Sequence, residues 1–292
     1  MQPDQKNKNA VKTDKIEKKN LYGREITFKV LRFNPEQDKK PYLQSYRLIL
    51  ERGMTVLDGL MHLKETQDPT LSYRKSCRMG ICGSCAMYVN GLPVLACQTQ
   101  ISELESTVIE VRPLPNYPIL RDVVPDLQSL FRFHESVKPW IIRKDTEELE
   151  KATGEYRQSP RELEDYIQFA YCIKCGACLA ACPTCATDKS FTGPQALGAA
   201  FRYMADSRDD GFEDRMNTEP VNSRNGIWRC HFAGACSEAC PKGVDPALGI
   251  QLLKSMIVLR KKSPPAPLAD QPAEGTRLEG VPDAPARTVK EH

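Results

Sequence analysis

The residues of this chain best suited to chemistry are its twelve cysteines, which occur in three groups. Five lie in YCIKCGACLAACPTC (171–185), four lie between positions 77 and 97, and three lie between 230 and 240. Thiolates are soft metal ligands and redox-active groups. Because no apolar secretory leader precedes them, we expect a reducing cytoplasm, where such cysteines serve metal or redox chemistry and not disulfides.

The first group has the spacing C-x4-C-x2-C-x11-C and consists of Cys77, Cys82, Cys85 and Cys97. This is the plant-type 2Fe-2S spacing. Gly80 and Gly83 lie between the ligands, where the chain must turn sharply and pass close to a cluster. A four-thiolate zinc knuckle is the alternative, but zinc sites usually use two C-x2-4-C pairs, and the second pair is missing. We therefore predict a 2Fe-2S cluster.

The other two groups read as paired ferredoxin runs. The first is C-x2-C-x2-C-x3-C-P and the second is C-x5-C-x3-C-P. In two-cluster bacterial ferredoxins the last cysteine of such a run binds the other cluster. Crossing the ligands predicts a 4Fe-4S cluster on Cys172, Cys175, Cys178 and Cys240. The remaining set is Cys182, Cys230 and Cys236.

Ala233 stands where this last set should have its fourth ligand. A methyl group cannot bind iron, so we predict a 3Fe-4S cluster, which lower negative charge and burial make easier to reduce than its neighbour. These sets use eleven thiols and leave Cys185 over. We interpret Cys185 as a small, partly buried thiol; the alternative is that it completes a fourth iron site.

Hydrophobic patterns indicate the elements that position the first group. Residues 24–33 and 44–50 alternate apolar and polar residues and are predicted to pair as strands. Thr55 and Asp58 have the spacing of a capping box that starts a helix. Asn90-Gly91 predicts a type I′ hairpin, and residues 107–111 predict a closing strand. Such a curled sheet crossed by one helix suits a plant-type ferredoxin, or β-grasp, domain.

The second half reads as helical. Ser159, Pro160 and Glu162 predict a capped helix that runs into Cys172, with Leu163, Tyr166, Ile167 and Ala170 on one face. Further helices are predicted around 197–204, and from Asp245-Pro246 with Leu248, Leu252, Met256 and Ile257 on its apolar face. Helices around 122–142 and 246–260 are expected to dock on partners. The fold class is therefore α+β: a β-grasp domain, then an all-α two-cluster domain.

Composition sets the limits of the folded part. Residues 1–20 hold six Lys against Asp4, Asp14 and Glu17, and this charge of +3 equals the net charge of the whole chain. Residues 263–292 hold six Pro and no aromatic residue. We expect both tails to be disordered, with domains at 21–128 and 129–262. No segment has 18 uncharged apolar residues, so we predict no transmembrane helix.

The chain resembles the iron-sulfur subunits of succinate dehydrogenase and fumarate reductase, the respiratory complex II family, over about residues 24–260. The resemblance rests on the motifs SCRMGICGSC, CIKCGACLAACP, ADSRDDG and RCHFAGACSEACPKGVDP. It implies an electron-transfer subunit that passes electrons from the FAD of a flavoprotein partner through 2Fe-2S, 4Fe-4S and 3Fe-4S clusters to a membrane quinone. It also implies a place on the cytoplasmic face of a prokaryotic membrane, held by an anchor subunit.

The resemblance further implies which residues lie near the quinone. His231 and Pro183 match quinone-proximal positions of the family, with a histidine hydrogen-bonded at the cluster rim as the alternative for His231. Trp228 is placed in the same quinone-proximal set and is interpreted as packing over the cluster. Members with a well-known quinone pocket carry tryptophan where this chain has Thr187. That departure suits an anchor that contains haem and a different pocket, such as one for menaquinone.

Other functions fit the sequence less well. A free soluble ferredoxin is the main alternative, but such carriers are small and acidic. A zinc-stabilised nucleic-acid binder needs basic stripes, whereas Lys174, Lys189 and Lys242 are isolated, so no nucleic-acid partner is expected. Related subunits of other fumarate reductase-like complexes usually bring further cysteine-rich repeats. A GxGxxG motif after a strand is absent, so the dicarboxylate chemistry is expected on a partner.

Overall fold

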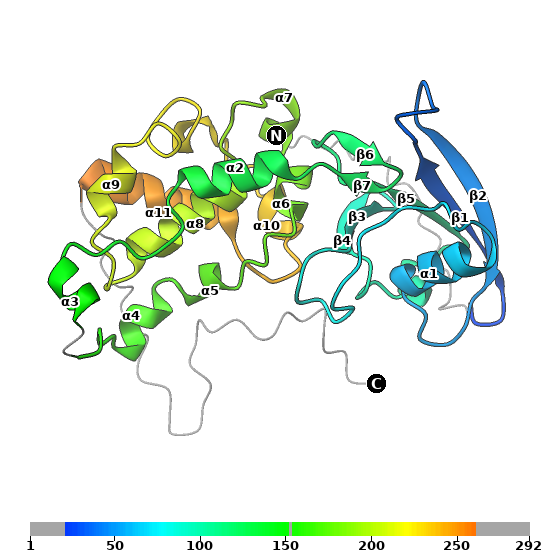
Figure 1. The fold of residues 1–292 in the computed structure, drawn as a ribbon, viewed down its shortest axis with the longest axis horizontal. Helices are drawn as coiled ribbons and strands as arrows, with labels where there is room; N and C mark the ends of the chain where they lie inside the picture. The colour runs from blue at the N-terminus through cyan, green and yellow to red at the C-terminus, as the bar shows by residue number, and fades with distance from the viewer. Residues whose placement is uncertain (1–20, 152–153, 261–292) are drawn as a thin grey trace, which may run out of the picture.

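The computed structural model describes residues 21–151 and 154–260. The predicted tails, 1–20 and 263–292, lie outside the described residues. The described part has a sheet-containing half at one end and a helical half at the other (Figure 1). This arrangement confirms the α+β fold class.

A five-stranded mixed sheet forms the first half, in the order β2-β1-β5-β3-β4. Strands β1 (Glu25–Arg32) and β2 (Tyr42–Ile49) are antiparallel, as predicted, with Phe28 opposite Tyr46. Strand β5 (Val108–Arg112) lies parallel to β1 and antiparallel to β3 (Ala86–Val89), which pairs with β4 (Leu92–Leu95). The closing strand therefore joins the two hairpins. Ile26, Phe28 and Val30 of the neighbouring strand β1 are fully buried.

Local sequence signals explain two connections of this half. Asn90 and Gly91 have φ angles of 46° and 86°, as a type I′ turn requires. Helix α1 (Val56–Thr66) begins at the predicted capping box, in which Asp58 N donates to Thr55 Oγ1 and Thr55 N donates to Asp58 Oδ2. A Cβ at Gly59 would lie 2.6 Å from the Phe28 ring, so the glycine lets α1 pack directly on the sheet.

Short elements lead from the sheet into the helical half. They are the two-stranded ribbon β6 (Ile119–Arg121) and β7 (Val124–Pro125), and helix α2 (Gln128–Ser136); the 3₁₀ turn η1 (Ile101–Leu104) lies earlier, between β4 and β5. Helix α2 is shorter than the predicted docking helix around 122–142, because the ribbon occupies the start of that range. It lies across α8 (Pro194–Ala205) (Figure 1).

The remaining elements are mostly single helical turns separated by cysteine-bearing loops. They are α3 (Thr146–Glu150), α4 (Pro160–Glu164), α5 (Ile167–Ala170), α6 (Ala177–Ala181), α7 (Pro183–Thr187), α9 (Phe212–Met216), η2 (Ile227–Arg229), α10 (Ala235–Glu238) and α11 (Pro246–Leu259). The long helices α8 and α11 pack together and form the core of this half. Phe169 and Phe201 add an edge-to-face ring pair with centroids 4.7 Å apart.

Two helix predictions need correction. The capping box at Ser159 is present, but the helix after it breaks into α4 and α5. Tyr166 turns inward at the break, where its hydroxyl donates to Gln158 Oε1 at 2.7 Å, while Leu163 is left exposed. Helix α11 begins at Asp245 as predicted, but Leu248 is exposed, and Ile250 and Leu253 are fully buried instead.

Candidate functional site

The loop between α1 and β3 carries Cys77 and Cys82 of the first cysteine group. Three backbone N–H groups, of Met79, Ile81 and Cys82, donate to Cys77 Sγ at 3.4, 3.3 and 3.3 Å. The loop is able to curl around this sulfur because Gly80 and Gly83 have φ angles of 70° and 74°. A nest of N–H donors around a thiolate is the environment that iron-sulfur sulfurs require, so the loop fits a 2Fe-2S cluster.

The other thiols of the first group come from the hairpin. Cys85 and Cys97 lie next to each other, and Ala96 N donates to Cys85 O at 3.1 Å. The thiols of Cys82 and Cys85 differ in exposure and in pKa. A hydrogen bond with Ser84 lowers the pKa of exposed Cys82 to about 6, whereas burial raises the pKa of Cys85 to about 12. One side of the group is therefore open to solvent, and the other faces the sheet.

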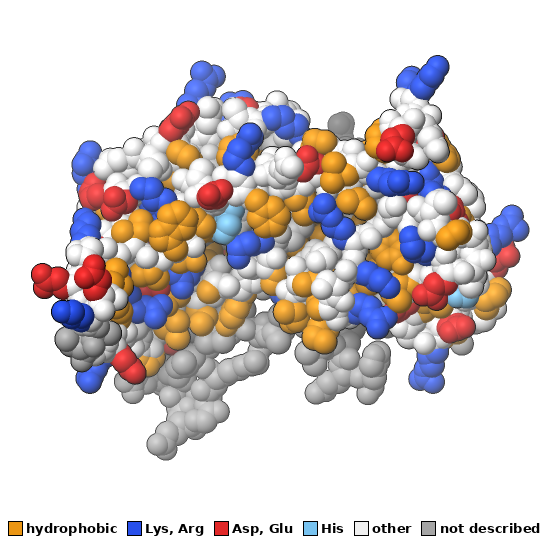
Figure 2. All heavy atoms as spheres, viewed as in Figure 1, with side chains coloured by type: hydrophobic (Ala, Val, Ile, Leu, Met, Phe, Trp, Pro, Cys, Tyr) orange, Lys and Arg blue, Asp and Glu red, His pale blue; other side chains and the backbone are white. Residues whose placement is uncertain are grey.

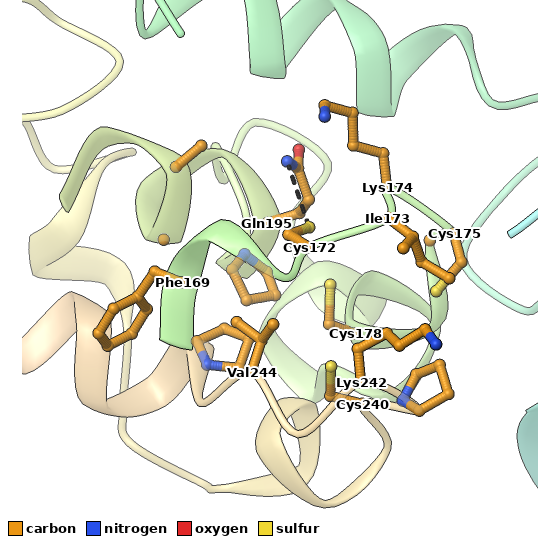
Figure 3. Close-up of a pocket in the computed structure, with 16 residues that line it drawn as sticks. Phe169, Cys172, Ile173, Lys174, Cys175, Cys178, Gln195, Cys240, Lys242 and Val244 are labelled. Carbon is orange, nitrogen blue, oxygen red and sulfur yellow. Dashed lines mark hydrogen bonds between the residues drawn. The ribbon is translucent and has the colours of Figure 1, made fainter. Parts of the chain in front are cut away.

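The predicted 4Fe-4S ligand set, called the second group from here on, lines one cavity of about 470 Å³, open space at its mouth included. Figure 3 shows its four cysteines arranged around it. They are Cys172, Cys175, Cys178 and Cys240. The rest of the cavity wall is mostly apolar, with Phe169, Ile173 and Val244 among its residues, and its polar members are Lys174, Gln195 and Lys242. Burial raises the pKa of Cys175 to about 12, and also raises the pKa values of Cys178 and Cys240.

The predicted 3Fe-4S ligand set, called the third group from here on, lines a smaller cavity of about 330 Å³, which also includes open space. Its cysteines are Cys182, Cys230 and Cys236. Ala233 lies in the same wall, as do Pro183 and His231. Burial raises the pKa of Cys236 to about 11. The structure thus brings together the three thiols and the methyl group that the ligand crossing predicted.

Cys185 is buried but is not among the described residues that line the smaller cavity. It lines a separate hollow together with Asn116 and Lys189. A hydrogen bond with Cys185 lowers the pKa of Cys182 to about 6, and the same bond raises the pKa of Cys185. These positions favour the interpretation of Cys185 as a buried thiol beside a ligand.

Trp228 and Thr187 are placed away from the cavity walls. Trp228 is not among the described residues that line the smaller cavity; its indole is 48% exposed, and its Nε1 donates to Asn222 Oδ1 at 2.8 Å. Thr187 Oγ1 donates to the carbonyls of Pro183 and Thr184, closing α7. Of the three residues predicted near the quinone, Pro183 and His231 lie together at the cavity, and Trp228 lies outside it.

Two relationships at the site were not predicted from the sequence. Gly83 of the first loop packs against Cys175 of the second group, and a Cβ at Gly83 would lie 2.9 Å from Cys175 Cβ. Gln195 reaches from α8 to Cys172 (Figure 3), with its Nε2 3.9 Å from Cys172 Sγ. The one available sequence signal was that Gln195 is polar within the apolar run PQALGAAF.

The described residues lack two larger features, a site for a single metal ion and a membrane-spanning helix. They contain no set of three or more His, Cys, Asp or Glu arranged to hold a single metal ion. None of the helices in residues 21–151 and 154–260 is long and apolar enough to cross a membrane.

Two family models match the chain. A 2Fe-2S iron-sulfur cluster binding domain matches residues 27–132, and a 4Fe-4S dicluster domain matches residues 168–244. These ranges contain all twelve cysteines. These matches confirm, at the level of the domain, the 2Fe-2S and 4Fe-4S cluster types that the cysteine spacing predicted.

Known relatives are similar over most of the chain. The fumarate reductase iron-sulfur subunit of Mycobacterium tuberculosis is 45% identical over 229 residues, which is 78% of this chain and 91% of that protein. The same subunit of Haemophilus influenzae is 44% identical over 233 residues, 77% of this chain and 90% of that one. The mitochondrial succinate dehydrogenase [ubiquinone] iron-sulfur subunit of Dictyostelium discoideum is 36% identical over 239 residues, 80% and 82% of the two chains.

A solved structure has the same fold. The matching chain of the Mycobacterium smegmatis Sdh1 complex in the apo form superposes with a TM-score of 0.70 at 26% identity, covering 84% of this chain and all of that one. The family models, the relatives and the shared fold agree with one another. The chain therefore belongs to the family of iron-sulfur electron-transfer subunits of fumarate reductase and succinate dehydrogenase.

Proposed function

We propose that this chain relays single electrons between an FAD-containing flavoprotein partner and a membrane quinone, through three clusters held in a fixed order. The proposed ligands of the 2Fe-2S cluster are Cys77, Cys82, Cys85 and Cys97. Those of the 4Fe-4S cluster are Cys172, Cys175, Cys178 and Cys240. Those of the 3Fe-4S cluster are Cys182, Cys230 and Cys236. Each cluster, when bound, supplies one-electron redox chemistry, and the chain holds and orients it.

The observation that carries this proposal is the chain of contacts between the three thiol groups. Gly83 packs on Cys175, which joins the first group to the second. Helix α6 then joins the second group to the third, since Cys178 lies within it and Cys182 follows its end. The three groups therefore lie one after another, as an electron relay requires.

The two ends of the relay suggest the partners. The outer edge of the first loop exposes Met79 and Ile81, whose side chains are 68% and 58% accessible, a surface suited to docking on a flavoprotein. At the other end Phe232, 57% exposed, stands beside His231 at the smaller cavity. We propose that this end faces the anchor subunit and the quinone, at the cytoplasmic face of a prokaryotic membrane. Figure 2 shows basic and acidic side chains interspersed over the viewed face of the described residues.

We propose domain limits at 21–128 and 129–262. The first domain then holds the 2Fe-2S ligands, and the second holds the ligands of the other two clusters. Helix α2 begins at Gln128 and packs on α8, which favours its assignment to the helical domain. The direction of physiological turnover is a property of the complex, because the same relay serves succinate oxidation and fumarate reduction.

Low-temperature EPR of the purified complex tests the proposal. We expect a 3Fe-4S signal in the oxidised sample and a 2Fe-2S signal after reduction with dithionite. The iron-free alternatives predict neither signal, and a soluble ferredoxin would purify without flavoprotein or anchor subunits. Two 4Fe-4S clusters in the unmodified protein would contradict the proposed ligand set of the third group.

A further inference from the structure

We propose that Gln195 is a positioning residue that raises the reduction potential of the 4Fe-4S cluster by donating a hydrogen bond to the sulfur of Cys172. The inference rests on the proposed function, because it requires a cluster on Cys172. It adds to that function a residue that is neither a cysteine nor a part of any cysteine motif.

The geometry places the amide nitrogen of Gln195 between two acceptors. Gln195 Nε2 lies 3.9 Å from Cys172 Sγ and 3.1 Å from His134 Nδ1. A primary amide carries two N–H groups, so one nitrogen can donate to both. The side chain lines the cavity of the second thiol group and is only 4% exposed. Figure 3 shows it directed toward Cys172.

The buried amide oxygen argues that this orientation serves the sulfur. Gln195 Oε1 is buried without a hydrogen-bond partner among the described residues, which costs free energy. A residue present only for packing would be apolar, like its buried neighbours Ala196 and Leu197. Exchanging the oxygen and nitrogen would place an acceptor against an anionic thiolate. The amide is therefore oriented with its nitrogen toward Cys172, although its oxygen then has no hydrogen-bond partner among the described residues.

His134 holds the amide in this orientation. For Nε2 to donate to the ring, His134 Nδ1 must be unprotonated, and burial lowers the pKa of His134 to about 4, so the ring is neutral at physiological pH. His134 lies on α2, which packs on the helix that carries Gln195. The contact between α2 and α8 thus sets the direction of the hydrogen bond.

A hydrogen bond to a cluster sulfur stabilises the form that carries one more electron, because that form is more negative. The step in which it acts is a one-electron exchange with the neighbouring clusters, and no covalent bond forms or breaks. Gln195 keeps its protons throughout. Its effect is to make the middle relay site easier to reduce.

Potentiometric titration of the purified complex, followed by EPR, tests the proposal through the variant Gln195→Leu. At the midpoint potential of the wild-type 4Fe-4S cluster, we expect the ratio of reduced to oxidised cluster to fall about tenfold, or about 59 mV for a one-electron couple. The 2Fe-2S and 3Fe-4S potentials serve as internal references and should not change. The matched control is Gln251→Leu, which removes an amide of α11 that is not among the described residues lining the cavities of the second and third groups.

An unchanged 4Fe-4S potential in a fully loaded Gln195→Leu complex would overturn the inference. If this variant does not assemble, a pair of His134 variants decides. His134→Asn keeps an acceptor for the amide and should preserve the potential, whereas His134→Leu should lower it; equal potentials in the pair would also overturn the inference. Absence of a 4Fe-4S cluster from the unmodified complex would instead refute the proposed function itself.

Discussion

Gly83 and Cys175 pack closely across the junction of the two halves, with no room for a side chain at Gly83. A Cβ at Gly83 would lie 2.9 Å from Cys175 Cβ and 3.0 Å from Cys175 Cα. Gly83 also has a φ of +74°, which L side chains rarely adopt. Glycine therefore serves two purposes here: it turns the first loop around its thiols, and it lets that loop touch the loop of the second group.

We expect Gly83→Ala to slow electron transfer from the first cluster to the second, because the added methyl group must push the two loops apart. The measurement is the rate of reduction of the second cluster by freeze-quench EPR. The matched control is Gly53→Ala, which has a φ of +77° and nothing within 4 Å of the added carbon. Both variants carry backbone strain of about 1–2 kcal/mol, so slowing by Gly53→Ala to the same extent would refute the role of the contact.

Ala233→Cys is expected to convert the third cluster from the 3Fe-4S to the 4Fe-4S type, because it adds the missing thiolate to the wall shared by Cys182, Cys230 and Cys236. In EPR the oxidised 3Fe-4S signal should disappear. Ala235→Cys is the control, since it adds a thiol to the same cavity two residues away and should leave the signal in place. Persistence of the signal in Ala233→Cys would refute the assignment of the open corner.

Asn116 is expected to stabilise the docking of the helical half on the first half. Its Nδ2 donates to the carbonyls of Leu179 and Ala180 at 2.8 and 3.0 Å, which satisfies the C-terminal end of α6. Asn116→Gly keeps the backbone freedom that the φ of +70° needs but removes the amide, and should lower the free energy of unfolding by about 1–3 kcal/mol.

Chemical denaturation of the isolated subunit measures this change. Asn116→Ala should lower the free energy further, because it adds the strain of a positive φ. If the unfolding midpoint of Asn116→Gly lies at the same denaturant concentration as that of the wild type, the amide does not stabilise the junction.

His134 should make the protein sensitive to acid. Its pKa falls from the ordinary 6.5 to about 4, chiefly through burial, with Lys174 as a second cause. As the pH falls from about 6.5 to about 4, His134 becomes protonated in the unfolded chain but stays neutral in the folded chain. The free energy of unfolding therefore decreases over this range. We expect His134→Asn to reduce the loss of thermal stability over this range. The exposed His62→Asn is the control, and parallel pH profiles for wild type and His134→Asn would contradict the expectation.

Local patterns in the sequence were sufficient for part of the fold. The capping box of Thr55 and Asp58 and the turn at Asn90-Gly91 formed as predicted, because each depends on residues only a few positions apart. The cysteine groups were also brought together as predicted, since cluster ligands follow fixed spacings.

Long-range relationships could not be read from the sequence. The helix before Cys172 breaks at Tyr166, whose hydroxyl accepts a hydrogen bond of 3.0 Å from Arg208 Nη2. Arg208 lies 42 residues further along the chain. Arg32 is buried where Nε donates to Asp122 Oδ1 at 3.0 Å, across 90 residues. Gln195 likewise meets Cys172 only after α8 has packed. Such pairings form only in the tertiary structure, so a pattern of neighbouring residues in the sequence does not predict them.

Metal and sulfide analysis of the anaerobically purified complex tests the central claim most directly, because every assignment above requires eleven thiols to hold three iron-sulfur clusters. We predict about nine irons and about ten sulfides for each copy of this chain, in addition to any haem iron of the partners, and no zinc. Stoichiometric zinc, or an iron content far below nine with the subunit intact, would contradict the account.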